Sequence, residues 1–230
     1  MKQIKHIHSN SITFRLMFGI ILFSTTFNLH AQSEEFQNLP QYLFPEFSTS
    51  TIKMKIGTDR ILILNYNIVT EKMVFFQKNQ VFDLVNPETV DTAILNNRKF
   101  IPVDKVFYEV IIERPISLFI EHKGKIMEPG KPAAYGGTSQ VSSSNYVSNI
   151  QMNSSVYNLK LPGDLIIKTE SVFWIIINGN KYNFVNERQF DKIFQGKEKE
   201  IRSFIKSNHL KFENPLDVKK LVQFCIGFKK

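Results

Sequence analysis

Residues 51–67 read TIKMKIGTDRILILNYN, and this stretch contains the pattern that decides the fold. Ile52, Met54 and Ile56 alternate with lysines, which predicts a strand with one buried face and one solvated face. Turn-forming residues at 57–59 then lead the chain into a second strand over 60–67. The apolar run at 61–64 has no polar side, so we expect this second strand to be covered on both faces.

The strand period continues through most of the chain. Asn96 and Asn97 separate two apolar runs, and asparagine tolerates the positive φ that a two-residue turn needs, so we predict a hairpin there. Residues 32–50, with two prolines and four aromatic side chains, are expected to form an irregular arm that packs on the body. The remaining predicted strands cover residues 73–77, 81–85, 90–95, 98–103, 106–113, 116–122, 156–161, 165–168, 172–177 and 182–185.

From Glu187 onward the apolar spacing becomes that of helices. Asn214 is suited to cap a helix, and Pro215 to the first helical position. Strands first and helices last predict an α+β fold, in which a largely antiparallel β-sheet body is followed by a short C-terminal helical segment. The three apolar stripes are Phe190, Ile193 and Phe194, then Ile201, Phe204 and Ile205, then Val218, Leu221, Val222 and Cys225.

The first 31 residues have the features of a signal peptide. Three basic residues and no acidic one accompany an apolar stretch at 16–29, shorter than the roughly 20 residues that a membrane-spanning helix needs. We expect cleavage between Ala31 and Gln32, which gives a signal peptide over 1–31, a β-rich body over 32–186 and helices packed on it over 187–230. The mature protein would be periplasmic or extracellular, without a transmembrane anchor.

The charge distribution argues against a nucleic-acid partner. The chain has a formal net charge of +8, but residues 187–230 hold eleven basic and six acidic residues, and residues 32–186 hold fifteen of each. A nucleic-acid-binding face needs a basic stripe with stacking aromatics, which a neutral body does not supply. The lysines of the helices could meet anionic lipid or glycan, although a solvated helix face is the commoner arrangement.

No motif of a known catalytic or cofactor site is present. After the leader, His122 and His209 remain, and neither has a second ligand at metal-site spacing. The sequence GTSQV at 137–141 lacks the second glycine of a serine-nucleophile turn, and the glycines at 130–137 do not form a phosphate loop. Cys225 lies on an apolar stripe, which favours a buried, unreactive thiol. We therefore assign no catalytic residue and expect no metal or cofactor.

The segment at 129–150 breaks the strand pattern and is rich in glycine and serine. A connection of this length is usually a binding loop, a lid or disordered. Aromatic side chains beside glycine and serine are typical of recognition loops. The candidate binding residues are therefore Lys131, Tyr135, Gly136, Gly137 and Tyr146, and the alternative is a solvated excursion without a ligand.

Several short motifs make the chain resemble uncharacterised exported proteins of Gram-negative bacteria, over nearly all of the mature sequence. They are LNYN at 64–67, NPETVD at 86–91, KFIPV at 99–103, GKPAAYGG at 130–137 and NERQF at 186–190. The resemblance implies residence in the periplasm or at the cell surface, and it adds no catalytic residue.

We expect a non-enzymatic exported protein, a periplasmic or envelope-associated binding module whose partner is an unknown protein or envelope component. One alternative is a hydrolase of cell-wall or glycan material, with carboxylates that converge only in the fold. Another is a structural component of an envelope assembly. A deep pocket with converging ionisable groups would favour the hydrolase, and a flat exposed face beside the 129–150 loop would favour binding.

Overall fold

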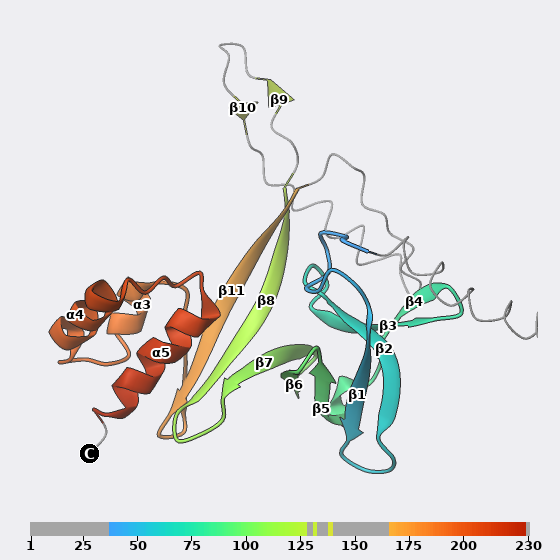
Figure 1. Cartoon of the computed structure of the whole chain (residues 1–230), viewed down its shortest axis with the longest axis horizontal. Helices are drawn as coiled ribbons and strands as arrows, with labels where there is room; N and C mark the ends of the chain where they lie inside the picture. Colours follow the sequence, from blue (N-terminus) through green and yellow to red (C-terminus); the bar gives the residue numbers. More distant parts are fainter. Residues whose placement is uncertain (1–36, 128–130, 133–137, 140–165, 229–230) are drawn as a thin grey trace, which may run out of the picture. The chain divides into compact units, whose positions relative to one another are not determined.

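The computed structural model describes residues 37–127, 131–132, 138–139 and 166–228. The strands of its main sheet are β1 (Ser48–Met54), β2 (Arg60–Asn67), β3 (Lys72–Gln77), β4 (Gln80–Asp83), β5 (Val90–Leu95), β6 (Arg98–Val103), β7 (Val106–Ile112), β8 (Ser117–Met127), β11 (Ile166–Ile177) and β12 (Asn180–Phe184). All pair antiparallel, in the order β12-β11-β8-β7-β6-β5-β1-β2-β3-β4 (Figure 1). A short 3-10 helix, η2 (Pro87–Thr89), precedes β5.

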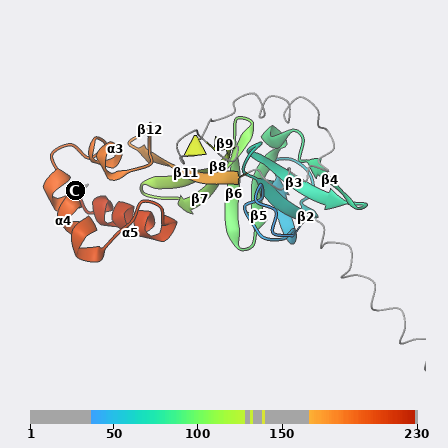
Figure 2. The ribbon, with the colours of Figure 1, turned by 90° about the horizontal axis from the view of Figure 1, so that it is seen from above.

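Three helices follow the sheet: α3 (Glu187–Asp191), α4 (Glu198–Asn208) and α5 (Pro215–Ile226). A ten-stranded antiparallel sheet followed by helices confirms the predicted α+β class. The helices lie together beside β11 and β12 (Figures 1 and 2). Among the described residues, no helix combines the length and apolar character that a membrane crossing requires.

Asparagine residues form two of the tight turns of the sheet. Asn96 and Asn97 have φ values of 46° and 61° between β5 and β6, which confirms the predicted hairpin. Asn178 and Gly179, with φ values of 52° and 80°, join β11 to β12 in the same way. These two-residue turns fix the register of the strands that they connect.

Part of the strand prediction was wrong. Ile61 and Ile63 of β2 are 73% and 44% exposed, so β2 is not covered on both faces. The first half of β2 is exposed or half-buried, and only Leu64 to Asn67, four consecutive residues, are covered on both faces. The predicted strands at 165–168 and 172–177 are one continuous strand, β11, and the strand predicted at 116–122 continues to Met127. The strand predicted at 156–161 lies outside the described residues.

The arm before β1 packs on the body, as predicted, from residue 37 onward. Phe44 is buried, and its backbone is held by the side chain of Asn65. The Asn65 amide donates to the Phe44 carbonyl at 2.9 Å, and its oxygen accepts from the Phe44 N–H at 3.2 Å. Two backbone hydrogen bonds, from Leu43 to Tyr66 and from Ile68 to Gln41, also pair the arm with the end of β2.

The helix ends follow from their capping residues. Asn186 accepts from the Gln189 N–H at 3.0 Å, and Asn214 accepts from the Leu216 N–H at 3.0 Å, so α3 and α5 begin where capping predicts. The α3 helix ends at Asp191, before the last two residues of its predicted stripe. Cys225 is buried in α5, and burial raises the pKa of its thiol to about 12, which keeps the thiol protonated and unreactive.

The sheet supports two separate cores. The first joins β8, β11 and β12 to the helices, and the second joins β1, β2, β3, β5, β6 and β7 to the arm. The β8–β11 pair contributes to both, since Leu118 and Ile175 belong to the first core and Ile167 packs against the second. The first core includes Ile116, Leu118, Ile120, Phe173, Ile175, Phe184, Phe190, Ile201, Val218, Leu221 and Val222, and the second includes Phe44, Ile52, Leu64, Tyr66, Ile68, Met73, Val90, Ala93, Leu95, Phe100 and Phe107.

The sheet curls until the end of β2 reaches β8, although four strands separate them in the sheet order. The Gly124 N–H donates to the Ile68 carbonyl at 2.7 Å. A Cβ at Gly124 would lie 2.8 Å from Ile68 Cγ1 and 3.0 Å from Ile167 Cγ2. Only glycine permits so close a contact between backbone and side chain.

We expect Gly124→Ala to lower the free energy of unfolding by about 1–3 kcal/mol, because the new methyl overlaps the β-branched Ile68 side chain. Urea unfolding of Gly124→Ala, Ile68→Ala and the double variant measures this effect. Removal of Cγ1 in Ile68→Ala should make room, so the double variant should cost less than the sum of the two single variants. Strictly additive changes in the free energy of unfolding would show that the two side chains do not clash.

Candidate functional site

Most of the residues predicted to bind lie outside the described part of the chain. This holds for Tyr135, Gly136, Gly137 and Tyr146, and also for the predicted cleavage site at Ala31 and Gln32. Lys131 belongs to β9 (Lys131–Pro132), which pairs with β10 (Thr138–Ser139) in a separate two-stranded sheet. The binding role of all five residues stays a prediction.

The junction of this segment with the main sheet is described. Met127, the last residue of β8, pairs with Ile166, the first residue of β11. The two strands that flank residues 128–165 in the sequence are therefore direct neighbours in the sheet, and their facing ends are paired.

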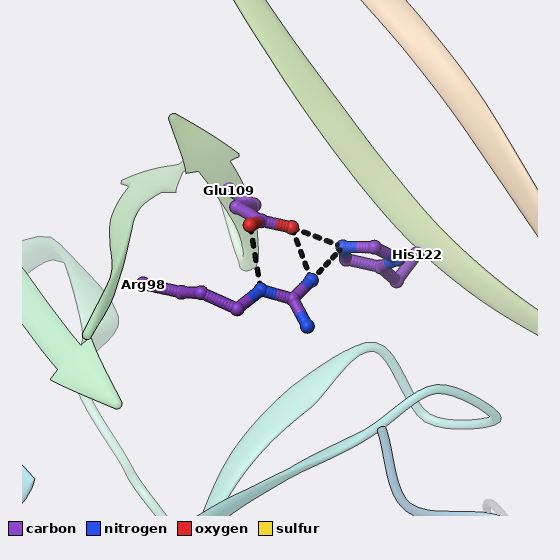
Figure 3. Close-up of polar contacts among 3 residues, drawn as sticks. All are labelled: Arg98, Glu109 and His122. Atoms are coloured by element: carbon purple, nitrogen blue, oxygen red, sulfur yellow. Dashed lines mark hydrogen bonds and ion pairs between the residues drawn. The ribbon is translucent and has the colours of Figure 1, made fainter. Parts of the chain in front are cut away.

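A buried polar cluster lies on β6, β7 and β8 (Figure 3). Arg98 donates through Nε to Glu109 Oε1 at 2.6 Å and through Nη2 to Glu109 Oε2. His122 Nε2 lies 2.7 Å from the same Oε2, and since a carboxylate only accepts, the shared proton belongs to the imidazole. Both carboxylate oxygens of Glu109 are thus occupied.

The electrostatics of the cluster depend on the balance between burial and these hydrogen bonds. Burial alone would raise the pKa of Glu109, but the hydrogen bonds from His122 and Arg98 outweigh it and lower the pKa below its usual value. The Arg98 guanidinium also lies over the rings of Phe44 and Phe100, at 4.9 and 5.8 Å from their centroids. Glu109 and His122, which are buried, and Arg98, which is partly exposed, thus bind one another beside Phe44 and Phe100 of the second core.

A second polar chain lies on the other side of β8, because neighbouring residues of a strand face opposite sides. Trp174 Nε1 donates to Glu121 Oε2 at 2.8 Å, and Lys123 Nζ lies 3.0 Å from Glu121 Oε1. Lys123 also reaches Glu71 in the turn between β2 and β3, at 3.5 Å. Burial is the largest cause that raises the pKa of Glu71, and repulsion from Glu121 raises it further, despite the attraction of Lys123.

Trp174 and Tyr108 form an aromatic pair on this outer side. Their rings are nearly parallel, 19° apart, with centroids separated by 5.9 Å. The ammonium of Lys181 lies over both, at 4.1 Å from the Trp174 centroid and 5.1 Å from that of Tyr108. Burial and the nearby Glu121 and Glu71 raise the pKa of Tyr108 to about 12, so its phenol stays neutral.

An open groove of about 490 Å³ begins at the edge of this aromatic pair. We call it the Trp174 groove. It lies between the end of the sheet and the region of α3, and no carboxylate is among its described lining residues. It therefore presents two ammonium groups and two amides beside an indole, and its lining is Trp174, Lys181, Tyr182, Asn183, Gln189, Lys192 and Ile193.

The two histidines of the body have different surroundings. His122 was expected at the end of a strand, but β8 continues past it and buries it. His209 ends α4 with a positive φ of 53°, as expected for a helix end. Within the described ranges, no three His, Cys, Asp or Glu side chains are placed to hold a metal ion.

Sequence reasoning identified neither polar cluster nor the groove. Their members come from separate strands, and only the strand register brings them together. No family model, curated protein or solved structure matches the chain.

Proposed function

We propose that the protein is an exported, non-enzymatic binding module of the cell envelope, and that the Trp174 groove contacts its ligand. The observation that carries the proposal is the groove itself. The single tryptophan of the chain is half-buried there, beside two lysines and two amide side chains. Export rests on the leader-like features of residues 1–31 and is part of the same proposal.

The groove favours an anionic saccharide as the ligand. Its ammonium groups, on Lys181 and Lys192, attract an acidic group, and the half-buried indole beneath Lys181 adds apolar surface at the edge of the groove. The oxygen of Gln189 already accepts from the Val185 N–H at 2.8 Å, which fixes the amide with its N–H₂ available as a donor. Envelope glycans that carry carboxylates combine these features.

The alternative of a glycan hydrolase has less support. Such an enzyme needs two carboxyl groups that converge on one glycosidic bond. Glu109 and Glu121, the buried carboxylates of β7 and β8, face opposite sides of the sheet, and both oxygens of each are engaged. The described residues thus favour binding over hydrolysis.

Tryptophan fluorescence tests the proposal, because Trp174 is the only tryptophan and reports on the groove directly. Titration with an oligogalacturonate should give a saturable change, and a neutral galactan of equal length should not. Lys181→Gln with Lys192→Gln should weaken binding by at least about tenfold, since hydrogen bonds to charged groups are lost. Lys206→Gln on α4 is the matched control and should leave affinity unchanged.

Equal affinity of the double variant and the wild type would exclude the groove as the binding site. Release of reducing ends from the oligogalacturonate, lost in a Glu109→Gln or Glu121→Gln variant, would instead identify an enzyme. Binding of neutral and acidic chains with equal strength would exclude a role for the two lysines.

A further inference from the structure

A second surface, at the turn between β1 and β2, is independent of the groove. Ile56 in this turn is 90% exposed, and Val85, just after β4, is 72% exposed. With Ile61 and Ile63 of β2 they make up half of the eight large apolar side chains that are exposed in the described part of the chain. We call these four residues the apolar tip. Ile56 and Val85 line one hollow, and Ile61 and Ile63 lie on the other face of the β1–β2 hairpin, so the tip exposes apolar side chains on both faces. Large exposed apolar surface of this kind marks interaction sites.

A hollow of about 320 Å³ makes the tip continuous with the body. Ile56 and Val85 line it together with Met54, and Arg60 stands among its lining residues. The backbone N–H of Lys55 donates to the Thr89 carbonyl at 3.0 Å, which ties the turn to η2. The turn that carries Ile56 is therefore tied to η2 beside the hollow.

Unpaired cations surround the apolar tip. Lys53, Lys55 and Arg60 are exposed, and no described acidic side chain lies within ion-pair distance of any of them. Asp59 is the only acidic residue between positions 53 and 60, and its carboxylate accepts from the Met54 N–H at 3.2 Å, which shapes the turn. Glu88 of η2 lines a different hollow, beside Lys72 and Lys105.

The C-terminal helices hold most of the basic excess but expose less apolar surface. Lys197 lies 3.1 Å from Glu200, and Arg202 lies 2.7 Å from Asp191. Leu216 is the one large apolar side chain of the described helices that is mainly exposed, against the four of the apolar tip. The larger exposed apolar surface beside cations is therefore that of the β1–β2 hairpin.

We propose that the apolar tip docks on an anionic phospholipid surface. Its aliphatic side chains enter the boundary between head groups and acyl chains, while Lys53, Lys55 and Arg60 contact lipid phosphates. Interfacial binding needs both contributions, apolar burial and attraction to anionic lipid. A second copy of the chain fits less well, because a symmetric contact would set the same cations against each other. The turn lies at the lower end of the β1–β2 hairpin in Figure 1.

Vesicle co-sedimentation of the full protein tests the proposal. We expect binding to vesicles of equimolar phosphatidylcholine and phosphatidylglycerol, little binding to phosphatidylcholine alone, and weaker binding as salt screens the charges. Ile56→Ser with Ile61→Ser should reduce binding by at least about tenfold, because less apolar surface is then buried in the lipid. The double variant Lys53→Gln with Lys55→Gln should reduce binding to the mixed vesicles and leave the weak binding to pure phosphatidylcholine vesicles unchanged.

Matched controls come from the helices. Leu216→Ser removes an equally exposed apolar side chain, and Lys206→Gln removes an exposed cation, and both should bind like the wild type. Ile56→Trp adds an indole at the tip that bromine-labelled lipid should quench, while Trp174 in the wild type should stay unquenched.

Three results would overturn the proposal. The first is equal loss of binding in the tip and control variants, and the second is absence of binding to either vesicle. The third is a dimer in lipid-free solution that Ile56→Ser with Ile61→Ser dissociates, which would assign the apolar tip to a second copy of the chain.

Discussion

Glu109→Ala is expected to lower the free energy of unfolding by about 3 kcal/mol, because it leaves Arg98 and His122 without their shared carboxylate. The Arg98 side chain is 34% exposed and can partly rehydrate, which keeps the cost at the lower end of the range for broken buried ion pairs. Guanidinium unfolding followed by circular dichroism measures the difference.

Glu113→Ala is the control for this variant. Glu113 follows β7, is largely exposed, and pairs with Lys99 at 2.7 Å. A surface pair of this kind contributes little to stability, because water screens both charges. Equal costs for the Glu109 and Glu113 variants would mean that the buried cluster adds nothing beyond a surface ion pair.

The stability that the Arg98, Glu109 and His122 cluster contributes should also depend on pH. Because the pKa of Glu109 is lowered in the folded protein, its ionised form stabilises the fold at pH values above the ordinary glutamate pKa of about 4.3. This contribution is lost as the pH falls through the lowered value. The gap in unfolding free energy between wild type and Glu109→Gln should therefore narrow in acid, and a constant gap would contradict the assignment.

Phe184→Ala is expected to cost about 3–5 kcal/mol, because it opens a cavity where the sheet meets the helices. The Phe184 ring stacks on Phe173 at 5.4 Å and meets Phe190 edge-on at 4.9 Å and Phe212 at 6.1 Å between centroids. Val185→Ala, at the next and exposed position, should change the stability by less than about 0.5 kcal/mol.

Hydrogen exchange should locate the damage in the Phe184→Ala variant. Since the chain has two cores, amides of β12 and the helices should exchange faster, while those of β1, β2 and β5 keep most of their protection. A uniform loss of protection would show that the two cores unfold as one unit.

Local features of the fold could be predicted from the sequence, because local chemistry determines them. The Asn96–Asn97 turn needs only residues that tolerate positive φ, and the start of α5 needs only Asn214 and Pro215. The exposure of Ile61 could not be predicted in this way. An apolar run gives the composition of both strand faces, but not whether a second layer covers them.

The polar clusters could not be predicted, because their members meet through strand register. Arg98, Glu109 and His122 come from three strands, and an irregularity between Val110 and Ile112 shifts the pairing of β7 with β8. Such a bulge has no clear mark in the sequence, yet it determines which residues of β8 lie beside Glu109. The same applies to Trp174, whose aromatic partner Tyr108 lies two strands away.

The pairing of Met127 with Ile166 has a consequence for how this protein can change over evolution. A segment whose two ends are neighbours can be lengthened, shortened or exchanged at little energetic cost, roughly 0.6 kcal/mol for each doubling of its length. Met127 and Ile166 end strands that the rest of the sheet already holds, so an exchanged segment would attach at this junction without a change in the strand order.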